Sequence, residues 1–392
     1  MVANQRSGEN SGYRWAVLFA SLLAFVAYAF ALQAVPPLIP SVVVEFGITN
    51  AEAGLLMSVV LIPGILLSLF AGSVLVRRYD VVRVGIASLT CVILGSLVTA
   101  LADSFAIMLV GRFVVGIGGA FIFAVTPAII AQWFPGKEMG KAMGIFGINM
   151  PLGTVIAFRT SSVLALAYGL RFPFYVSAII GLVALGVFAA VVKEGPFLRE
   201  KATSSMRQAL RNFEVWKVGF VWLFFNASAL AFTTWGEKLF EVFRGVPSVE
   251  ASVLASLLMW TAIFFVPVFG YLSDKIGKRR VFAILGLSLM TVAFVALAFS
   301  SGLALIASIV FLGVAAGMTP PVASALPAEI LGADLASVGF GITGTCLNIG
   351  ASLAQPLIGG LLDATGSYAF SMLGMASLSA LGVLVSATLK TR

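Results

Sequence analysis

Long apolar segments alternate with short polar stretches along the whole chain. A helix needs about 20 apolar residues to cross a hydrocarbon layer of about 30 Å, and each segment approaches or exceeds that length. The pattern therefore predicts an all-α membrane protein with twelve transmembrane helices. We expect them near residues 15–40, 50–75, 83–101, 105–134, 139–166, 172–192, 216–238, 250–272, 281–299, 303–328, 336–361 and 367–388.

Composition supports this prediction, and the charge distribution orients the chain. The residues are 60% hydrophobic and 10% charged, with a mean hydropathy of +1.08, whereas soluble proteins carry about 25% charged residues. With both termini in the cytoplasm, nineteen of the 24 Lys and Arg residues fall on the inner side and three on the outer side. This positive-inside bias predicts a multi-pass protein of the cell membrane. It explains the net charge of +8 without a nucleic-acid partner.

A polar stretch divides the apolar segments six and six. It reads KEGPFLREKATSSMRQALRNFEVWK and covers residues 193–217. We expect an N-terminal six-helix bundle at 1–194, a cytoplasmic linker at 195–214 and a C-terminal six-helix bundle at 215–392. The first apolar segment is expected to be a retained helix, because it is too long for a signal-peptide core and no small-residue cleavage site follows it.

The two halves resemble each other at a nearly constant offset. GITNAEAG at 47–54 matches GVPSVEAS at 245–252, an offset of 198. Three glycines of the fifth segment, Gly144, Gly147 and Gly153, correspond to Gly341, Gly344 and Gly350 at an offset of 197. Six-helix halves repeated in parallel, with a site between them near the midplane, are typical of secondary transporters.

Small residues and prolines within the segments predict how the helices pack. Glycines gather in the fifth segment at 140, 144, 147 and 153 and in the eleventh at 339, 341, 344 and 350, where they would let membrane helices pack closely. Six prolines are expected to kink their helices, mainly as packing features. They are Pro63, Pro127, Pro151, Pro267, Pro320 and Pro356.

Two motifs resemble those of a known family. The stretch GYLSDKIGKRR at 270–280 closely resembles the loop between the second and third helices of each half in the major facilitator superfamily. GRFVVGIGGA at 111–120 is similar to the family's fourth-helix motif, with Arg112 at its arginine. Together with the twelve segments and the linker, the resemblance covers essentially the whole chain. It implies alternating access by a rocker-switch motion of two bundles, with the 270–280 loop as a latch.

The residues expected in this conformational latch are Gly270, Asp274, Gly277, Arg279 and, in the first half, Arg77. Gly270 would let two helix backbones approach closely, and Gly277 would adopt a turn closed to other residues. Asp274 would face a helix N-terminus or a nearby arginine. In the first half Val76 stands at the aspartate position and Asp80 follows four residues later. We therefore predict that replacing Asp274 impairs transport more than replacing Asp80.

Two arginines stand inside apolar segments. Arg112 lies 23 residues before Pro135 and Arg159 lies 24 after it, so both are expected at similar depth on adjacent antiparallel helices. A charge at the bilayer centre costs roughly 2.5–3.5 kcal/mol on insertion scales and usually faces water or a partner. Arg159 could snorkel to the outer headgroups or point into a central cavity and attract an anion. For Arg112 the alternative to substrate contact is an interior hydrogen-bonding role.

Other mid-depth residues complete the candidate substrate site: Tyr28, Gln33, Asn149, Asn226, Trp260 and Asn348. For each polar residue an interhelical hydrogen bond is an equally good interpretation, and Trp260 could instead be an interfacial anchor. The carboxylates lie in loops or near helix ends, with Glu237 and Asp363 nearest to the interior. Arginines without carboxylates suit an anion, because a guanidinium matches carboxylate, nitrate-like and phosphate groups.

We therefore expect a monomeric secondary active or facilitative transporter, embedded in a lipid bilayer, that moves a small anionic solute such as an organic carboxylate or a small oxyanion. A coupling proton is compatible with this expectation if the substrate carries it. The alternative is an exporter of amphipathic drugs or other hydrophobic small molecules. Without histidine or a metal-ligand cluster in the sequence, we expect no cofactor, no metal and no enzyme activity. Cys91 and Cys346 lie in apolar segments, so no disulfide framework is expected.

Overall fold

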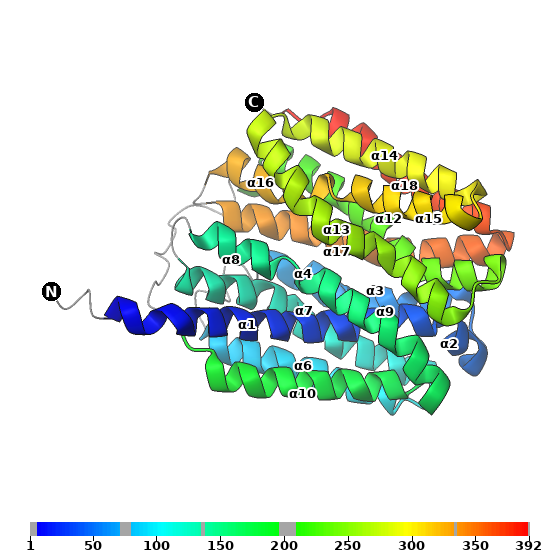
Figure 1. Ribbon diagram of the computed structural model, residues 1–392, viewed down its shortest axis with the longest axis horizontal. Helices are drawn as coiled ribbons and strands as arrows, with labels where there is room; N and C mark the ends of the chain where they lie inside the picture. Colours follow the sequence, from blue (N-terminus) through cyan, green and yellow to red (C-terminus); the bar gives the residue numbers. More distant parts are fainter. Residues whose placement is uncertain (1–5, 71–79, 135–137, 196–208, 333–334, 391–392) are drawn as a thin grey trace.

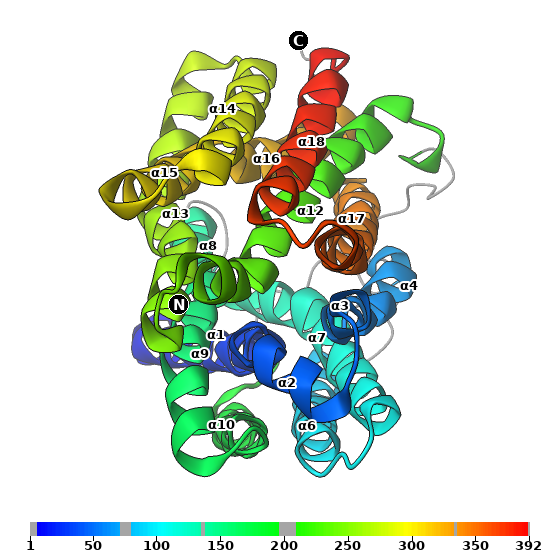
Figure 2. The same ribbon diagram turned by 90° about the vertical axis from the view of Figure 1, so that its right-hand side faces the viewer.

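The computed structural model describes residues 6–70, 80–134, 138–195, 209–332 and 335–390. Within these ranges the regular structure is helical, and twelve helical segments are long and apolar enough to cross a membrane. The prediction of twelve spans is confirmed. They form two six-helix bundles, seen in the lower and upper parts of Figure 2, with the blue-to-green first half below the yellow-to-red helices of the second half.

The first bundle contains six spans. Its helices are α1 (Arg6–Gln33), continued by the 3-10 turn η1 (Pro36–Leu38) and α2 (Ile39–Phe46); α3 (Asn50–Val59) with α4 (Ile62–Phe70); α6 (Val81–Ala100); α7 (Phe105–Trp133); α8 (Glu138–Phe146) with α9 (Asn149–Tyr168); and α10 (Phe172–Val191). These helices run roughly parallel to the long axis of the molecule (Figure 1).

The second bundle also contains six spans. Its helices are α12 (Phe213–Arg244), α13 (Ser248–Ile276), α14 (Arg279–Phe299), α15 (Gly302–Ala316) with α16 (Thr319–Leu331), α17 (Ala336–Thr365) and α18 (Tyr368–Ala387). We call the end of the molecule where α1 begins and α18 ends the N/C end, at the left of Figure 1, and the opposite end the far end.

Three of the six predicted kinks are complete breaks between helices. Pro63, Pro151 and Pro320 each lie within the first three residues after a break, in α4, α9 and α16. Proline has no N–H and clashes with the preceding turn, so the helix before it ends. The other three prolines, Pro127, Pro267 and Pro356, lie inside the continuous helices α7, α13 and α17.

The internal repeat is visible in the backbone. Gly47 ends α2 with φ 60° and Gly245 ends α12 with φ 64°, a left-handed conformation that favours glycine. The next helices, α3 and α13, start at Asn50 and Ser248, so the matched motifs build the same turn in both halves.

Close helix crossings follow the repeat as well. An added Cβ at Gly153 of α9 would collide with Ala29 of α1, and one at Gly350 of α17 would collide with the Leu223 backbone of α12. By contrast, a Cβ added at Gly140 or Gly144 would have no atom of the described residues within 4 Å. The expectation of close packing is therefore correct for Gly153 and Gly350 and wrong for Gly140 and Gly144.

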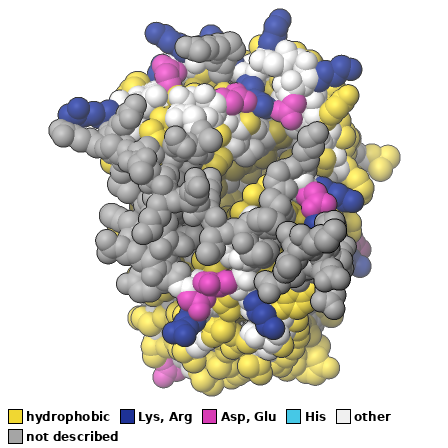
Figure 3. Space-filling model, turned by 90° about the vertical axis from the view of Figure 1, so that its left-hand side faces the viewer, with side chains coloured by type: hydrophobic (Ala, Val, Ile, Leu, Met, Phe, Trp, Pro, Cys, Tyr) yellow, Lys and Arg dark blue, Asp and Glu magenta, His cyan; other side chains and the backbone are white. Residues whose placement is uncertain are grey.

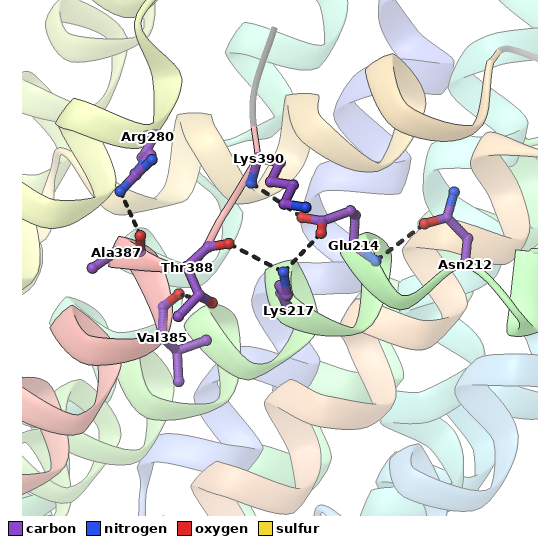
Figure 4. A network of polar contacts seen from close by, with 8 residues as sticks. All are labelled: Asn212, Glu214, Lys217, Arg280, Val385, Ala387, Thr388 and Lys390. Carbon is purple, nitrogen blue, oxygen red and sulfur yellow. Dashed lines mark hydrogen bonds and ion pairs between the residues drawn. The ribbon is translucent and has the colours of Figure 1, made fainter.

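Charged side chains gather at the N/C end, where Figure 3 shows lysines and arginines interspersed with acidic residues. One cluster fixes the end of the chain to the second bundle (Figure 4). The Glu214 carboxylate accepts from Lys217 Nζ at 2.7 Å and from the Lys390 N–H at 3.1 Å, and Lys217 also donates to the Thr388 carbonyl at 3.1 Å. These contacts tie the last residues described to the start of α12.

At the far end the two bundles are in direct contact. α3 packs against α17, α9 against α13, and η1 against α12. The Asp363 carboxylate of α17 accepts from the N–H groups of Asn50 and Ala51 at 3.1 and 2.8 Å, and Lys238 of α12 donates to the Asn50 side chain. The far end is therefore closed by packing and by polar contacts between the halves.

Candidate functional site

A cavity of about 570 Å³ lies between the two bundles, in the size range of small-molecule sites. Both halves contribute to its wall, through α1, α4, α7 and α9 on one side and α12, α13 and α17 on the other. It extends toward the N/C end, where Ser68 of α4 and Phe340 of α17 line it. The cavity is lined by both halves and is closed at the far end, so a solute could enter it only from the N/C end. It is therefore the candidate substrate site.

Two aromatic clusters occupy equivalent places on the two walls. On α1 and α7, Phe25 packs edge-to-face on Phe123 with ring centroids 4.7 Å apart, and Tyr28 lies beside both. On α12, Trp222 and Phe225 stack at 5.1 Å. Phe25 and Tyr28 match Trp222 and Phe225 at the same offset of 197 that relates the glycines. Phe25, Phe123 and Phe225 were not predicted from the sequence, although this offset could have identified the clusters on α1 and α12.

The asparagines give the cavity a polarity that follows from their hydrogen bonds. Asn226 and Asn348 each donate Nδ2 to the carbonyl four residues earlier, of Trp222 and Gly344, at 2.8 Å. A carbonyl can bond only to a donor, so their Oδ1 atoms remain as acceptors. On the first half Asn149 uses Oδ1 to accept from the Met150 N–H, which leaves Nδ2 as a donor.

Tyr28 adds a hydroxyl to the donor side of the cavity. Its ring packs against Gly119, where an added Cβ would collide with it, and no protein partner for its O–H is found among the described residues. The first half thus offers donors from Tyr28 and Asn149, and the second half offers acceptors from Asn226 and Asn348. These four are the predicted site residues that the cavity brings together.

Arg112 is buried behind this wall, 1% exposed, and does not line the cavity. Its Nε donates to the Leu56 carbonyl at 3.2 Å, and its terminal nitrogens donate to the carbonyls of Ala31 and Leu32 at 2.6 and 3.0 Å. These carbonyls lie where α1 ends before two prolines and where α3 ends. Helix ends leave carbonyls without intrahelical donors, so Arg112 supplies the donors that the two broken helices lack.

Arg159 lies on the outside of α9. Its side chain is exposed, in the same stripe as the exposed Ile156 and Val163, and it does not line the cavity. A guanidinium on such a stripe can reach the headgroup region by extending its stem. The placement corresponds to the snorkelling alternative.

The remaining predicted substrate residues lie apart from the cavity. Gln33 ends α1, fully buried, and neither of its amide atoms has a partner among the described residues. Trp260 of α13 is 44% exposed and does not line the cavity. Its exposed position corresponds to the interfacial-anchor alternative.

The latch loop at the N/C end is built around Arg279. Its guanidinium pairs with Asp274 and with Glu329 of α16, each at 2.7 Å, and donates to the Ser273 hydroxyl at 2.9 Å. The expectation that Asp274 meets a nearby arginine is confirmed. All these partners belong to the second half, and Glu329 was not predicted from the sequence.

The glycines of the loop differ. Gly277 ends α13 with φ 70°, as predicted for a turn closed to other residues. The expectation for Gly270 is wrong, because an added Cβ would meet Pro321 only at an ordinary 3.7 Å. Arg77 and Val76 lie outside the described residues. Asp80 caps α6, accepting from the Val82 N–H at 2.8 Å, and the greater importance of Asp274 stays a prediction.

Two repeated six-helix bundles around a central cavity define a polytopic membrane transporter. Within that class the chain belongs to the Major Facilitator Superfamily, whose family model matches residues 17–248 and 243–392.

Several known proteins are similar to this chain. The Probable nitrate/nitrite antiporter NarK1 of Thermus thermophilus is 26% identical over 68% of this chain and 62% of its own length. Multidrug resistance protein 2 of Bacillus subtilis is 24% identical over 93% and 94%, and the Probable sulfoacetate transporter SauU of Cupriavidus necator is 26% identical over 93% and 91%.

A solved structure shares the fold. It is a bacterial homologue of the human lysosomal transporter Spinster in an inward-facing and occupied conformation. The TM-score is 0.77 at 18% identity, covering 96% of each chain. At this identity the likeness concerns the fold alone.

Proposed function

We propose that this transporter moves an uncharged or amphipathic organic molecule across the membrane by alternating access between its two bundles. The N/C end, with most of the lysines and arginines, would face the cytoplasm. The observation that carries the proposal is the chemistry of the cavity. Among the described residues, no Lys, Arg, Asp or Glu lines it, while aromatic rings line it from both halves.

Physical chemistry favours such a solute over a small anion. An ionised group removed from water without a compensating charge or hydrogen bonds is strongly disfavoured, and both candidate guanidiniums lie outside the cavity wall. Asn226 and Asn348 present acceptor oxygens, which would repel an anion. A molecule with an apolar body, an acceptor toward Tyr28 and Asn149, and a donor toward the two acceptor asparagines would match the wall.

The similarity to Multidrug resistance protein 2 extends over nearly the whole chain and is consistent with this proposal. A small anion is the second candidate, because other relatives are named as nitrate/nitrite and sulfoacetate transporters. In that case Tyr28 and Asn149 would be its donors, since they offer the free N–H and O–H groups on the wall.

Two tryptophans provide a matched test. Trp222 lines the cavity and Trp260 of the neighbouring α13 does not. We expect purified protein in nanodiscs to bind the neutral fluorescent amphiphile N-phenyl-1-naphthylamine, measured by fluorescence enhancement. Trp222→Ala should weaken binding of the probe roughly 5- to 30-fold, equivalent to the loss of about 1–2 kcal/mol from an aromatic contact. Trp260→Ala should leave binding unchanged.

The anion candidate is tested on the same preparation by thermal stabilisation with nitrate, sulfoacetate or tartrate and by competition with the probe. Absence of probe binding, or equal losses in Trp222→Ala and Trp260→Ala, would overturn the amphiphile proposal. Stabilisation by one of these anions that is abolished in Asn149→Ala would favour the anion.

A further inference from the structure

A carboxylate is buried at the far end, outside the central cavity. Glu237 of α12 is 0% exposed and lies seven residues before the end of that helix at Arg244, about 10 Å along its axis. Its Oε1 lies 3.0 Å from the Ser162 hydroxyl of α9 and 3.4 Å from the Ser248 hydroxyl of α13. Its Oε2 is buried without a partner among the described residues.

The charged groups around Glu237 do not neutralise it. On its own helix, Lys238 donates to Asn50 of α3, and Glu241 adds a like charge one turn further on. The neighbouring helices α9, α13 and α17 bring Arg159, Glu250 and Asp363. The first two are exposed, and Asp363 accepts from Asn50 and Ala51. The turn η1, also packed on α12, carries no charged residue. Two further helices pack on α12: α18 brings Tyr368, whose ring lies beneath Arg244, and α16 brings Glu329, which pairs with Arg279.

The neutral acid fits this environment better than the anion. An ionised carboxylate with one unpaired buried oxygen carries a large desolvation cost. A protonated Glu237 can donate its O–H to Ser162, whose hydroxyl lies 2.6 Å from that of Ser252 and can pass the hydrogen bond on. All three groups then form a neutral chain across the interface.

This chain exists only while the far end is closed, because Ser162 belongs to the first half and Glu237 and Ser252 to the second. Ser161 on α9 and both amide atoms of Gln355 on α17 are also buried without partners in the part of the chain that the structure describes. The Gln355 backbone contacts Gly54 of α3, across the halves. Such groups are costly when buried, and they would be hydrated if the far end opened.

We propose that Glu237 is a proton-binding site that links protonation to closure of the far end. When the bundles separate there, the carboxyl group reaches water and releases its proton to a water molecule, keeping the bonding electron pair as a carboxylate. Closure requires the proton to return. The open-to-closed ratio should therefore rise with pH, by up to tenfold per unit where the open form is deprotonated.

Double electron–electron resonance between two spin labels tests this without any solute, so its outcome is independent of the proposed function. In a Cys91→Ala, Cys346→Ala background, labels replace Val44 on α2 and Leu303 on α15, which are 83% and 85% exposed at the far end of different halves. Distances are recorded in nanodiscs from pH 5 to pH 9. Wild-type protein should shift toward longer distances as pH rises.

Glu237→Gln, which resembles the protonated acid, should hold the short distance throughout, and the matched Glu241→Gln variant should respond like wild type. Ser162→Ala gives a second variant, expected to raise the open fraction at every pH. The proposal is overturned if Glu237→Gln keeps the wild-type pH response, or if wild type shows none. Closure driven by sodium at constant pH would also overturn it, since hydroxyl and carboxylate oxygens can bind that ion.

Discussion

At the scale of single residues, the two arginines inside the apolar segments have opposite surroundings. Arg112 donates hydrogen bonds to three backbone carbonyls at the ends of two broken helices. Arg159 extends from the outer face of α9 without a charged partner among the described residues. We therefore expect the fold to depend on Arg112 and to tolerate the loss of Arg159.

Arg112→Ala should lower stability strongly. Hydrogen bonds from a charged group contribute about 1.5–3 kcal/mol each, and the substitution also leaves a cavity. We expect a loss on the order of 3 kcal/mol or more, measured as thermal unfolding in detergent. Arg159→Ala is the control, expected within about 0.5 kcal/mol of wild type. Equal destabilisation by the two substitutions would contradict the structural role of Arg112.

At the scale of helices, one glycine in each half allows a close crossing between an equivalent pair of helices. Gly153 brings α9 onto α1, and Gly350 brings α17 onto α12. The equivalence of the two crossings is important because the first and seventh spans each carry two aromatic residues of the cavity wall. A change in either crossing would displace one wall.

Gly350→Ala is expected to destabilise the protein by about 1–3 kcal/mol, because the new methyl group would press on the Leu223 backbone and overpacking has this cost. Gly144→Ala is the matched control. It has open space, and replacing glycine within a helix gains about 0.5–1 kcal/mol. The stability of both variants is measured by chemical or thermal unfolding. A Gly350→Ala protein as stable as Gly144→Ala would refute the close crossing of α17 and α12.

Hydropathy predicted the number of helices well and their ends less well. The seventh span was expected at 216–238 and runs from Phe213 to Arg244, because backbone hydrogen bonding continues through polar turns that hydropathy scores as loop. Likewise, the sequence predicted kinks at all six prolines. It could not distinguish Pro63, Pro151 and Pro320, where the helices break, from Pro127, Pro267 and Pro356, where they continue. Whether a helix breaks or continues at a proline depends on which neighbours satisfy the freed carbonyls, as Arg112 does at the break before Pro63, where it donates to the Leu56 carbonyl.

At the scale of the whole molecule, the cavity was predictable in place but not in chemistry. The repeat placed a site between the halves, and four of the eight residues proposed for it line the cavity. Depth along a helix follows from counting residues, but the direction of a side chain depends on how the helix is rotated against its neighbours. Arg112 and Arg159 were expected at similar depths, yet the Arg112 side chain is buried among other helices and the Arg159 side chain is exposed.

Closure of the far end also involves Asp363, through a different kind of contact from that of Glu237. Its carboxylate caps the N-terminus of α3, accepting from two backbone N–H groups and from the Asn50 side chain at 2.6 Å. A negative charge at a helix N-terminus contributes about 0.3–1 kcal/mol when exposed. Here the helix belongs to one half and the charge to the other, so this energy favours the closed arrangement directly.

Asp363→Ala should therefore raise the open-to-closed ratio about 2- to 5-fold, the equivalent of about 0.4–1 kcal/mol. The measurement is the far-end distance distribution between labels at 44 and 303. Glu45→Gln is the control, since Glu45 pairs with Arg171 within the first half. An Asp363→Ala distribution identical to wild type would show that the Asp363 contacts do not contribute to closure of the far end.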